Sequence, residues 1–141
     1  PSRISDLESK KIVSSDRVYN FSKKTLLIAE DEDSNYKLLR MLLEDSNIVI
    51  LRALDGDEAV KMFSENSIDL ILMDIKMPGT DGITAVKKIR EINQDIPVIA
   101  QTAYAMEKDK QMCIEAGCND YLTKPIDEKK LFELLLKYMK T

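Results

Sequence analysis

Three acidic side chains follow apolar segments of the sequence in a pattern that could bind a cation. Asp74 ends the apolar run 70–73, and Glu30 and Asp31 follow the run 26–29. Carboxylates gathered at one place repel one another and raise one another's pKa unless a cation shares them. The chain has no histidine, and oxygen ligands alone favour Mg²⁺ or Mn²⁺ over Zn²⁺. A divalent cation is therefore expected at these acids.

A hydroxyl and an amine end two further apolar runs. Thr102 closes the run that begins at Val98, and Lys124 follows the run that begins at Tyr121. Once a cation screens the acids, Asp74 becomes a possible nucleophile toward phosphorus. The resulting acyl phosphate needs cations and donors around its oxygens, which Lys124 and Thr102 can supply. Phosphoryl transfer depends mainly on positioning and charge neutralisation, so these few residues predict an aspartyl-phosphate site.

Five repetitions of one pattern must position these side chains. Apolar runs of four to six residues begin near Thr25, Ile48, Leu70, Pro97 and Tyr121, and each is followed by a segment with helical spacing. Continuous apolar strands are typical of a parallel sheet that helices cover on both faces. In such doubly wound α/β sheets, ligands bind beyond the carboxyl ends of the strands. The pattern therefore brings the polar strand ends to one site.

Helix ends and buried stripes can also be predicted. The first helix should span about residues 34–45, with Asp33 or Ser34 as its capping residue, because acids and serine favour helix starts. The fourth should stop at Gly117, where glycine accepts a left-handed conformation, and Asp127 should cap the fifth. The buried stripe of the fourth helix is expected to contain Met106, Cys113 and Ala116. The methionines Met77 and Met112 are also expected in the core.

Composition indicates one globular domain. The 141 residues are 44% hydrophobic and 33% charged, and no apolar stretch approaches the roughly 18 residues of a membrane span. The start of the chain alternates polar and charged residues instead of resembling a signal peptide, so a cytoplasmic location is expected. Other segments of a parent protein could still anchor that protein in a membrane. Cys113 and Cys118 are expected to be reduced, because two cysteines without histidine form neither a zinc site nor a disulfide scaffold.

Charge divides the chain into two parts. Residues 1–24 hold six basic and three acidic residues, a net charge of +3, which leaves −7 for the remainder within the total of −4. We expect residues 1–24 to be a basic linker or N-terminal extension and residues 25–141 to be the folded domain. The acidic body argues against direct nucleic-acid binding, because phosphate backbones select clustered lysine and arginine. No membrane contact is expected of this segment.

The polar strand ends together resemble the receiver domain of two-component response regulators. Glu30 and Asp31, Asp74 within residues 73–82 (MDIKMPGTDG), Thr102 before Ala103, and Lys124 before Pro125 carry the resemblance, which covers residues from about 24 to 140. The resemblance implies a flavodoxin-like doubly wound (βα)5 sandwich, with a parallel five-stranded sheet in the order 2-1-3-4-5. It also implies a cis peptide bond between Lys124 and Pro125.

The same resemblance implies a phosphorelay chemistry. Asp74 would accept a phosphoryl group from the phosphohistidine of a histidine kinase or histidine phosphotransfer domain. Asp31, Asp74 and the backbone carbonyl of Lys76 would hold Mg²⁺, with Mn²⁺ as a substitute, and Glu30 would reach the ion through water. Lys124 would pair with the phosphate. The domain itself would then catalyse only its own phosphorylation and dephosphorylation.

Switching and phosphoryl lifetime are predicted at neighbouring positions. The resemblance implies that Thr102 moves toward the phosphate while Tyr121 turns inward, which changes a surface near the fourth helix and fifth strand that binds a downstream protein. A homodimer through the fourth and fifth helices is a further possibility. Lys76 and Tyr104, two residues past Asp74 and Thr102, should flank the path of an attacking water, and their bulk predicts slow self-hydrolysis.

Other readings of the sequence differ in how well they fit. A calcium loop beginning at Asp31 fails, because Tyr36 and Leu42 occupy positions that require glycine and glutamate. No Gly-x-Gly-x-x-Gly follows the first strand, which excludes a dinucleotide fold. A haloacid-type phosphatase remains a minor alternative, because Asp31 and Asp33 have its spacing. The receiver of a hybrid histidine kinase is favoured over a stand-alone regulator, since residues 19–24 resemble a linker of such kinases.

Overall fold

The fold is a five-stranded parallel sheet between two layers of helices. The computed structural model describes residues 20–77, 79, 81–103 and 106–139. The strands are β1 (Thr25–Ala29), β2 (Val49–Ala53), β3 (Leu70–Asp74), β4 (Val98–Thr102) and β5 (Asp120–Thr123). Their order is β2-β1-β3-β4-β5 and every pairing is parallel. The predicted flavodoxin-like architecture and strand order are therefore confirmed.

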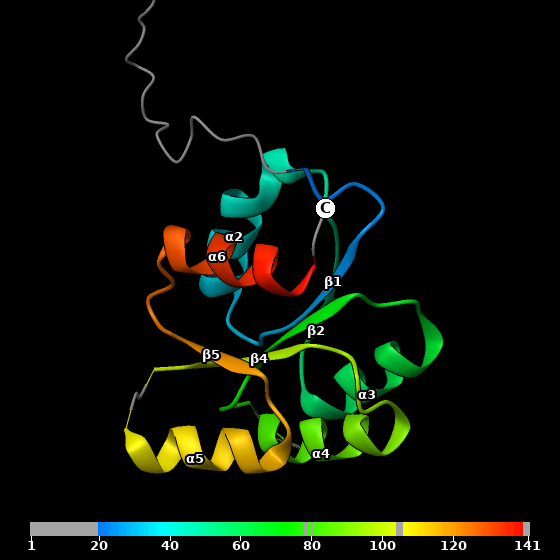
Figure 1. Ribbon diagram of the computed structural model, residues 1–141, viewed down its shortest axis with the longest axis vertical. Coiled ribbons are helices and arrows are strands. Elements are labelled where there is room, and N and C mark those ends of the chain that lie inside the picture. The colour runs from blue at the N-terminus through cyan, green and yellow to red at the C-terminus, as the bar shows by residue number, and fades with distance from the viewer. Residues whose placement is uncertain (1–19, 78, 80, 104–105, 140–141) are drawn as a thin grey trace, which may run out of the picture.

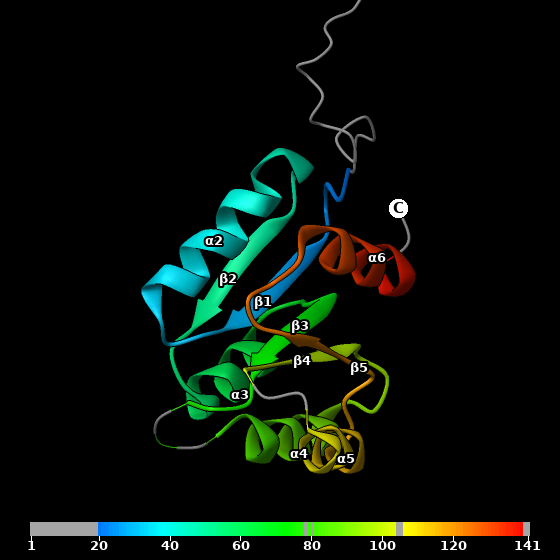
Figure 2. The ribbon, with the colours of Figure 1, turned by 90° about the vertical axis from the view of Figure 1, so that its left-hand side faces the viewer.

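The helices lie on opposite faces of the sheet. α2 (Asp33–Leu43) continues into a 3-10 turn (Glu44–Ser46), and the other helices are α3 (Gly56–Glu65), α4 (Gly82–Ile92), α5 (Glu107–Ala116) and α6 (Glu128–Tyr138). α2 and α6 cover one face, whereas α3, α4 and α5 cover the other (Figures 1 and 2). Within the described part of the chain, no helix is long and apolar enough to cross a membrane.

Each face of the sheet has its own apolar core. Side chains of β1 and β3 alternate between the two cores, and both strands are almost completely buried. Burying apolar area on both faces removes it from water at about 25 cal/mol per Å², so both strands are firmly held within the sheet. The strand ends that follow them, Glu30 and Asp74, are consequently held by a well-packed support.

The core begins before the first strand. Phe21 is completely buried, stacks on Phe132 of α6 with ring centroids 6.5 Å apart, and donates its main-chain N–H to the carbonyl of Ser46. Phe21 belongs to the segment that the sequence assigned to an extension. The division at residue 24 stays a prediction. The packed unit nevertheless includes Phe21, whose buried aromatic side chain contributes several kcal/mol to the stability of the fold.

Several predicted helix ends agree with the structure. Gly117 ends α5 at φ 114°, and its neighbour Cys118 donates to the carbonyl of Cys113 at 3.0 Å, which is the left-handed helix ending expected of glycine. Asp127 caps α6 by accepting the N–H of Lys130.

The Lys124–Pro125 peptide bond is cis, as the resemblance implied. Cys113 and Cys118 are both free thiols, as predicted.

Two local predictions are wrong. α2 begins at Asp33, with Glu32 as its N-cap residue and no side-chain cap, so neither Asp33 nor Ser34 has that role. Met106 is the N-cap residue of α5 and is 66% exposed, and Met112 is 44% exposed, whereas both were expected in the core. The buried face of α5 is narrow and takes only Cys113 and Ala116, which leaves the larger side chains in solvent.

Candidate functional site

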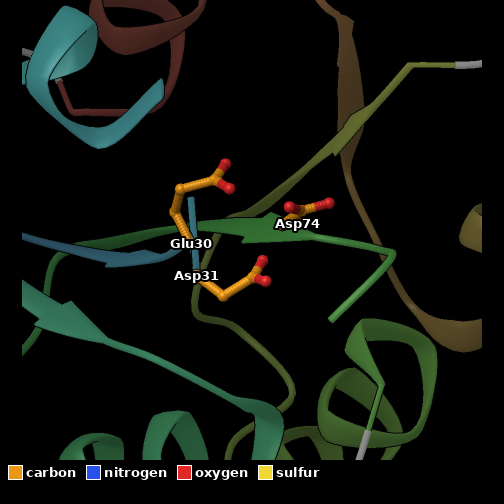
Figure 3. Close-up of side chains that lie close together, drawn as sticks. All are labelled: Glu30, Asp31 and Asp74. Carbon is orange, nitrogen blue, oxygen red and sulfur yellow. The ribbon is translucent and has the colours of Figure 1, made fainter. Parts of the chain in front are cut away.

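Three carboxylates lie together beyond the ends of the two central strands. Glu30 directly follows β1, Asp74 ends β3, and the pairing of Ala29 with Met73 makes the two acids neighbours across the sheet. Asp31 is the next residue along the chain. One carboxylate oxygen from each of these three acids lies within 4.8 Å of the others. Figure 3 shows that all three carboxylates extend in the direction in which β3 runs. The predicted acidic cluster therefore exists in the fold.

Lys124 joins two of these acids. Its Nζ lies 3.0 Å from Asp74 Oδ2 and 3.1 Å from Glu30 Oε1. The lysine side chain is 17% exposed, and the two carboxylates are almost fully buried. A buried carboxylate without a partner would be costly, so the ammonium is the group that lets both acids occupy this site.

The pKa of Asp74 is well above its usual value. Burial disfavours the ionised carboxyl and raises its pKa from 3.8 to about 6; the hydrogen bond from Lys124 opposes this shift, and the negative charge of Glu30 adds to it. Burial lowers the pKa of Lys124, but its hydrogen bonds and attraction to Asp74 and Glu30 outweigh burial and raise it. The site at neutral pH therefore holds an ionised acid that gains from additional positive charge.

Glu30 is fixed by donors from three directions. It is completely buried, and its Oε1 accepts from Lys124 Nζ and from Asn35 Nδ2, the latter at 2.6 Å. Its Oε2 accepts the main-chain N–H of Glu32 at 3.1 Å. Because every oxygen of this carboxylate has a donor, Glu30 is a rigid wall of the site. The hydrogen bond from Asn35 was not predicted from the sequence.

Thr102 and Tyr121 lie on the other side of the sheet from Glu30. Thr102 ends β4 and is 3% exposed, and Tyr121 pairs with Ala100, so both side chains leave the sheet on the same face. Tyr121 is half-buried, with the Nζ of Lys110 of α5 lying 4.9 Å from its ring centroid. The two predicted switch residues are therefore neighbours on adjacent strands beside α5.

The β3–α4 segment supplies a main-chain contact to Asp74. Lys76 donates its N–H to Asp74 Oδ1 at 3.0 Å, and its side chain is exposed. Tyr104, the other residue predicted to affect phosphoryl lifetime, lies outside the described residues. The two oxygens of Asp74 therefore have different partners, Lys76 on one side and Lys124 on the other.

The chain matches a known family of domains. Residues 26–136 match the response regulator receiver domain family. This chain belongs to that family. It is accordingly a receiver domain of a two-component phosphorelay, a class of domain that binds Mg²⁺ at an acidic site.

Two curated relatives illustrate the range of proteins that contain such a receiver domain. The signal transduction histidine-protein kinase BarA of Escherichia coli K12 is 43% identical over 116 residues, which cover 81% of this chain and 13% of the kinase. The polar-differentiation response regulator DivK of Brucella anthropi is 37% identical over 118 residues, covering 82% of this chain and 96% of the regulator. The receiver domain thus spans about an eighth of BarA and nearly all of DivK.

Solved structures agree in fold. The receiver domain of sensor histidine kinase PA1611 from Pseudomonas aeruginosa PAO1, which has magnesium coordinated in its active site cleft, superposes with a TM-score of 0.78 at 32% identity, covering 84% of this chain and 98% of that chain. The receiver domain of Ssk1 from Saccharomyces cerevisiae, crystallised with the histidine phosphotransfer protein Ypd1, gives a TM-score of 0.79 at 32% identity, covering 84% of this chain and 90% of that chain.

The donor set of this receiver domain suits a hard divalent cation. Glu30, Asp31 and Asp74 offer only carboxylate oxygens, and Asp31 is exposed while the other two are buried. Mg²⁺ prefers such oxygens and retains several waters, which the exposed side of Asp31 can accommodate. The residues present therefore fit a magnesium site that opens to solvent on one side.

Arg52 of the receiver domain supports the acidic cluster from β2 and was not predicted. Its Nε donates to the carbonyl of Glu30 at 3.0 Å, and its Nη1 lies 2.9 Å from Asp33 Oδ1. Its guanidinium also lies 4.4 Å from the ring centroid of Tyr36. The signal that could have found it is a charged residue inside the apolar run 49–53, where burial requires several partners.

Proposed function

We propose that Asp74 of this receiver domain accepts a phosphoryl group from a phosphohistidine, as the receiver module of a hybrid histidine kinase. The observation that carries the proposal is the contact of Lys124 with both Asp74 and Glu30, at 3.0 and 3.1 Å, beside a third acid. This contact places a cation against the acceptor oxygen and leaves the acids in need of further positive charge. The resemblance of the chain to BarA supports a kinase as parent protein.

The chemistry is a displacement at phosphorus. A carboxylate oxygen of Asp74 forms the new bond to phosphorus, the bond from phosphorus to the imidazole nitrogen breaks, and the departing imidazole takes up a proton. Lys124 neutralises charge on the phosphoryl oxygens, and the main-chain N–H of Lys76 holds the other oxygen of Asp74. Glu30, Asp31, Asp74 and the carbonyl of Lys76 would hold Mg²⁺ or, in its place, Mn²⁺. The bound metal supplies positive charge to the acids and the transferred group.

Output is proposed to pass through the face that carries Thr102 and Tyr121. A phosphoryl group adds nearly two negative charges and three acceptor oxygens, which can draw the Thr102 hydroxyl toward Asp74 and release space for Tyr121. Tyr121 contacts Lys110 of α5, so its movement would alter the surface of α5. A downstream protein, or a second copy bound through α5 and α6, would read that change.

A histidine phosphotransfer domain is the proposed phosphoryl partner of this receiver domain. The complex of the Ssk1 receiver domain with Ypd1 supports this choice, because the two receiver domains share the same fold over nine-tenths of the Ssk1 chain. A stand-alone regulator is the second candidate, and the near-complete coverage of DivK favours it. Asp33, which the haloacid-type reading would need beside Asp31, pairs with Arg52 instead and is 76% exposed.

Phosphoryl labelling tests the acceptor. Purified protein incubated with phosphoramidate and Mg²⁺ should gain the mass of one phosphoryl group, and Asp74→Asn should gain none. Asp45→Asn, at an exposed acid on the turn after α2, is the matched control and should be labelled like the natural chain. Undiminished labelling of Asp74→Asn would remove Asp74 as the acceptor, and labelling lost in Asp31→Asn alone would favour the haloacid-type chemistry.

A further inference from the structure

Asn35 shares the oxygen of Glu30 that Lys124 also contacts. Asn35 Nδ2 lies 2.6 Å from Glu30 Oε1, and Lys124 Nζ lies 3.1 Å from the same oxygen. Lys124 therefore divides its hydrogen bonds between Glu30 and Asp74, whereas the acid that Asn35 contacts is Glu30. If Lys124 turns to a phosphoryl group on Asp74, the oxygen of Glu30 keeps Asn35 as a donor.

Gln101 holds the amide of Asn35 in this position. Gln101 is completely buried, pairs with Asp74 in the sheet, and accepts from Asn35 Nδ2 through Oε1 at 3.3 Å. The two hydrogens of the Asn35 amide thus have two acceptors, Glu30 and Gln101, which fix its orientation. Gln101 Nε2 is buried and has no hydrogen-bond partner among the described residues. The residue that pairs with Asp74 in the sheet therefore also has an unused donor.

We propose that Asn35, oriented by Gln101, is a positioning residue that holds the Glu30 carboxylate when Lys124 moves to the phosphoryl group on Asp74. This inference rests on the proposed function and adds a role for two residues that the sequence did not single out. Before phosphorylation, Lys124 and Asn35 hold Glu30 together, so Asn35 is partly redundant. After phosphorylation, Asn35 carries this task with the main-chain N–H of Glu32.

The test compares two ligands on the intact chain. Calorimetry measures the Kd for Mg²⁺ alone, and then for beryllofluoride, a mimic of the phosphoryl group, at saturating Mg²⁺. Asn35→Leu should change the Mg²⁺ Kd by less than about twofold but weaken beryllofluoride by about tenfold, the effect of losing one hydrogen bond to a charged acceptor. Ser34→Leu, at the exposed neighbouring position on α2, should change neither.

A double variant separates positioning from general stability. In a Glu30→Gln background, adding Asn35→Leu should weaken beryllofluoride by less than about twofold, because the contact through which Asn35 acts is already altered. If the leucine variant folds poorly, Asn35→Ser takes its place in the test. The serine hydroxyl is too short to replace the amide, so this variant should show the same selective loss of beryllofluoride affinity. Gln101→Leu should give a smaller loss in the same direction.

The contrary outcomes are distinct. Unchanged beryllofluoride affinity in Asn35→Leu, or equal losses for Mg²⁺ and beryllofluoride, would overturn the role of Asn35 and leave the phosphoacceptor function standing. Failure of the natural chain to bind beryllofluoride at saturating Mg²⁺ would instead overturn the proposed function.

Discussion

The main-chain N–H of Lys124 donates to the carbonyl of Thr102 across 2.8 Å. The side chain of the same lysine contacts Asp74, so one residue links the end of β4 to the end of β3. The backbones that carry the two side chains proposed to contact the phosphate oxygens are thus fixed relative to each other. Such fixed placement is what phosphoryl transfer chiefly requires of a protein.

Magnesium affinity should depend on pH near the raised pKa of Asp74. The carboxyl has a pKa of about 6, so protons compete with the metal below that value and not above it. Calorimetric titrations should show a nearly constant Mg²⁺ Kd above about pH 7 and a Kd that rises toward about tenfold per unit below pH 6. A Kd that stays constant down to about pH 5 would contradict the assignment of Asp74 as a ligand.

Replacing Asp74 should stabilise the metal-free protein at neutral pH. The pKa in the folded state, about 6, exceeds the ordinary 3.8, so the natural chain loses stability as pH rises through this range and does not regain it above. We expect Asp74→Asn to raise the free energy of unfolding by about 1 kcal/mol at neutral pH, after allowance for screening and the lost Lys124 contact. Urea unfolding at about pH 7 and about pH 4 measures this, and the gain should vanish at the lower pH.

Arg52→Lys should loosen the β1–α2 segment. A lysine cannot supply at once the bond to the carbonyl of Glu30, the pair with Asp33 and the stacking on Tyr36. We expect unfolding to become easier by about 1–2 kcal/mol and Mg²⁺ to bind a few-fold more weakly, because Glu30 loses support. Arg40→Lys, on the exposed side of α2, is the control; equal behaviour of both variants would refute a supporting role.

Gly82→Ala should push α4 away from β3, the strand that ends at Asp74. A Cβ at this position would lie 2.2 Å from the carbonyl oxygen of Asp74 and 2.8 Å from Cα of Ile75, and both are backbone atoms. Displacing them should cost about 1–3 kcal/mol and reduce phosphoryl labelling of Asp74. Gly79→Ala meets no atom within 4 Å but has φ of +67°, so it should cost only the strain of about 1–2 kcal/mol. Chemical unfolding of the two variants distinguishes contact from strain.

The sequence predicted the acidic cluster because each acid directly follows a continuous apolar run. Glu30 and Asp74 could be placed at one edge from the parallel arrangement alone, since parallel strands carry their carboxyl ends to the same side. Lys124 could be placed by the same logic. These residues owe their positions to strand ends, which apolar patterning locates well.

The supporting residues could not be placed in this way. Asn35 and Tyr36 lie on a helix whose rotation about its axis depends on packing, and Gln101 and Arg52 lie within strands where an apolar residue is the norm. Their partners come from distant segments, such as the 66 positions that separate Asn35 from Gln101. Met106 illustrates the converse, because helical spacing placed it on a stripe although α5 starts one residue later.

The stacking of Phe21 on Phe132 ties the entrance of the domain to its last helix. A force applied through the residues that precede Phe21 would therefore act on α6 as well as on β1. A neighbouring module attached upstream would therefore act on α6 through Phe21 as well as on β1 through the chain that follows it.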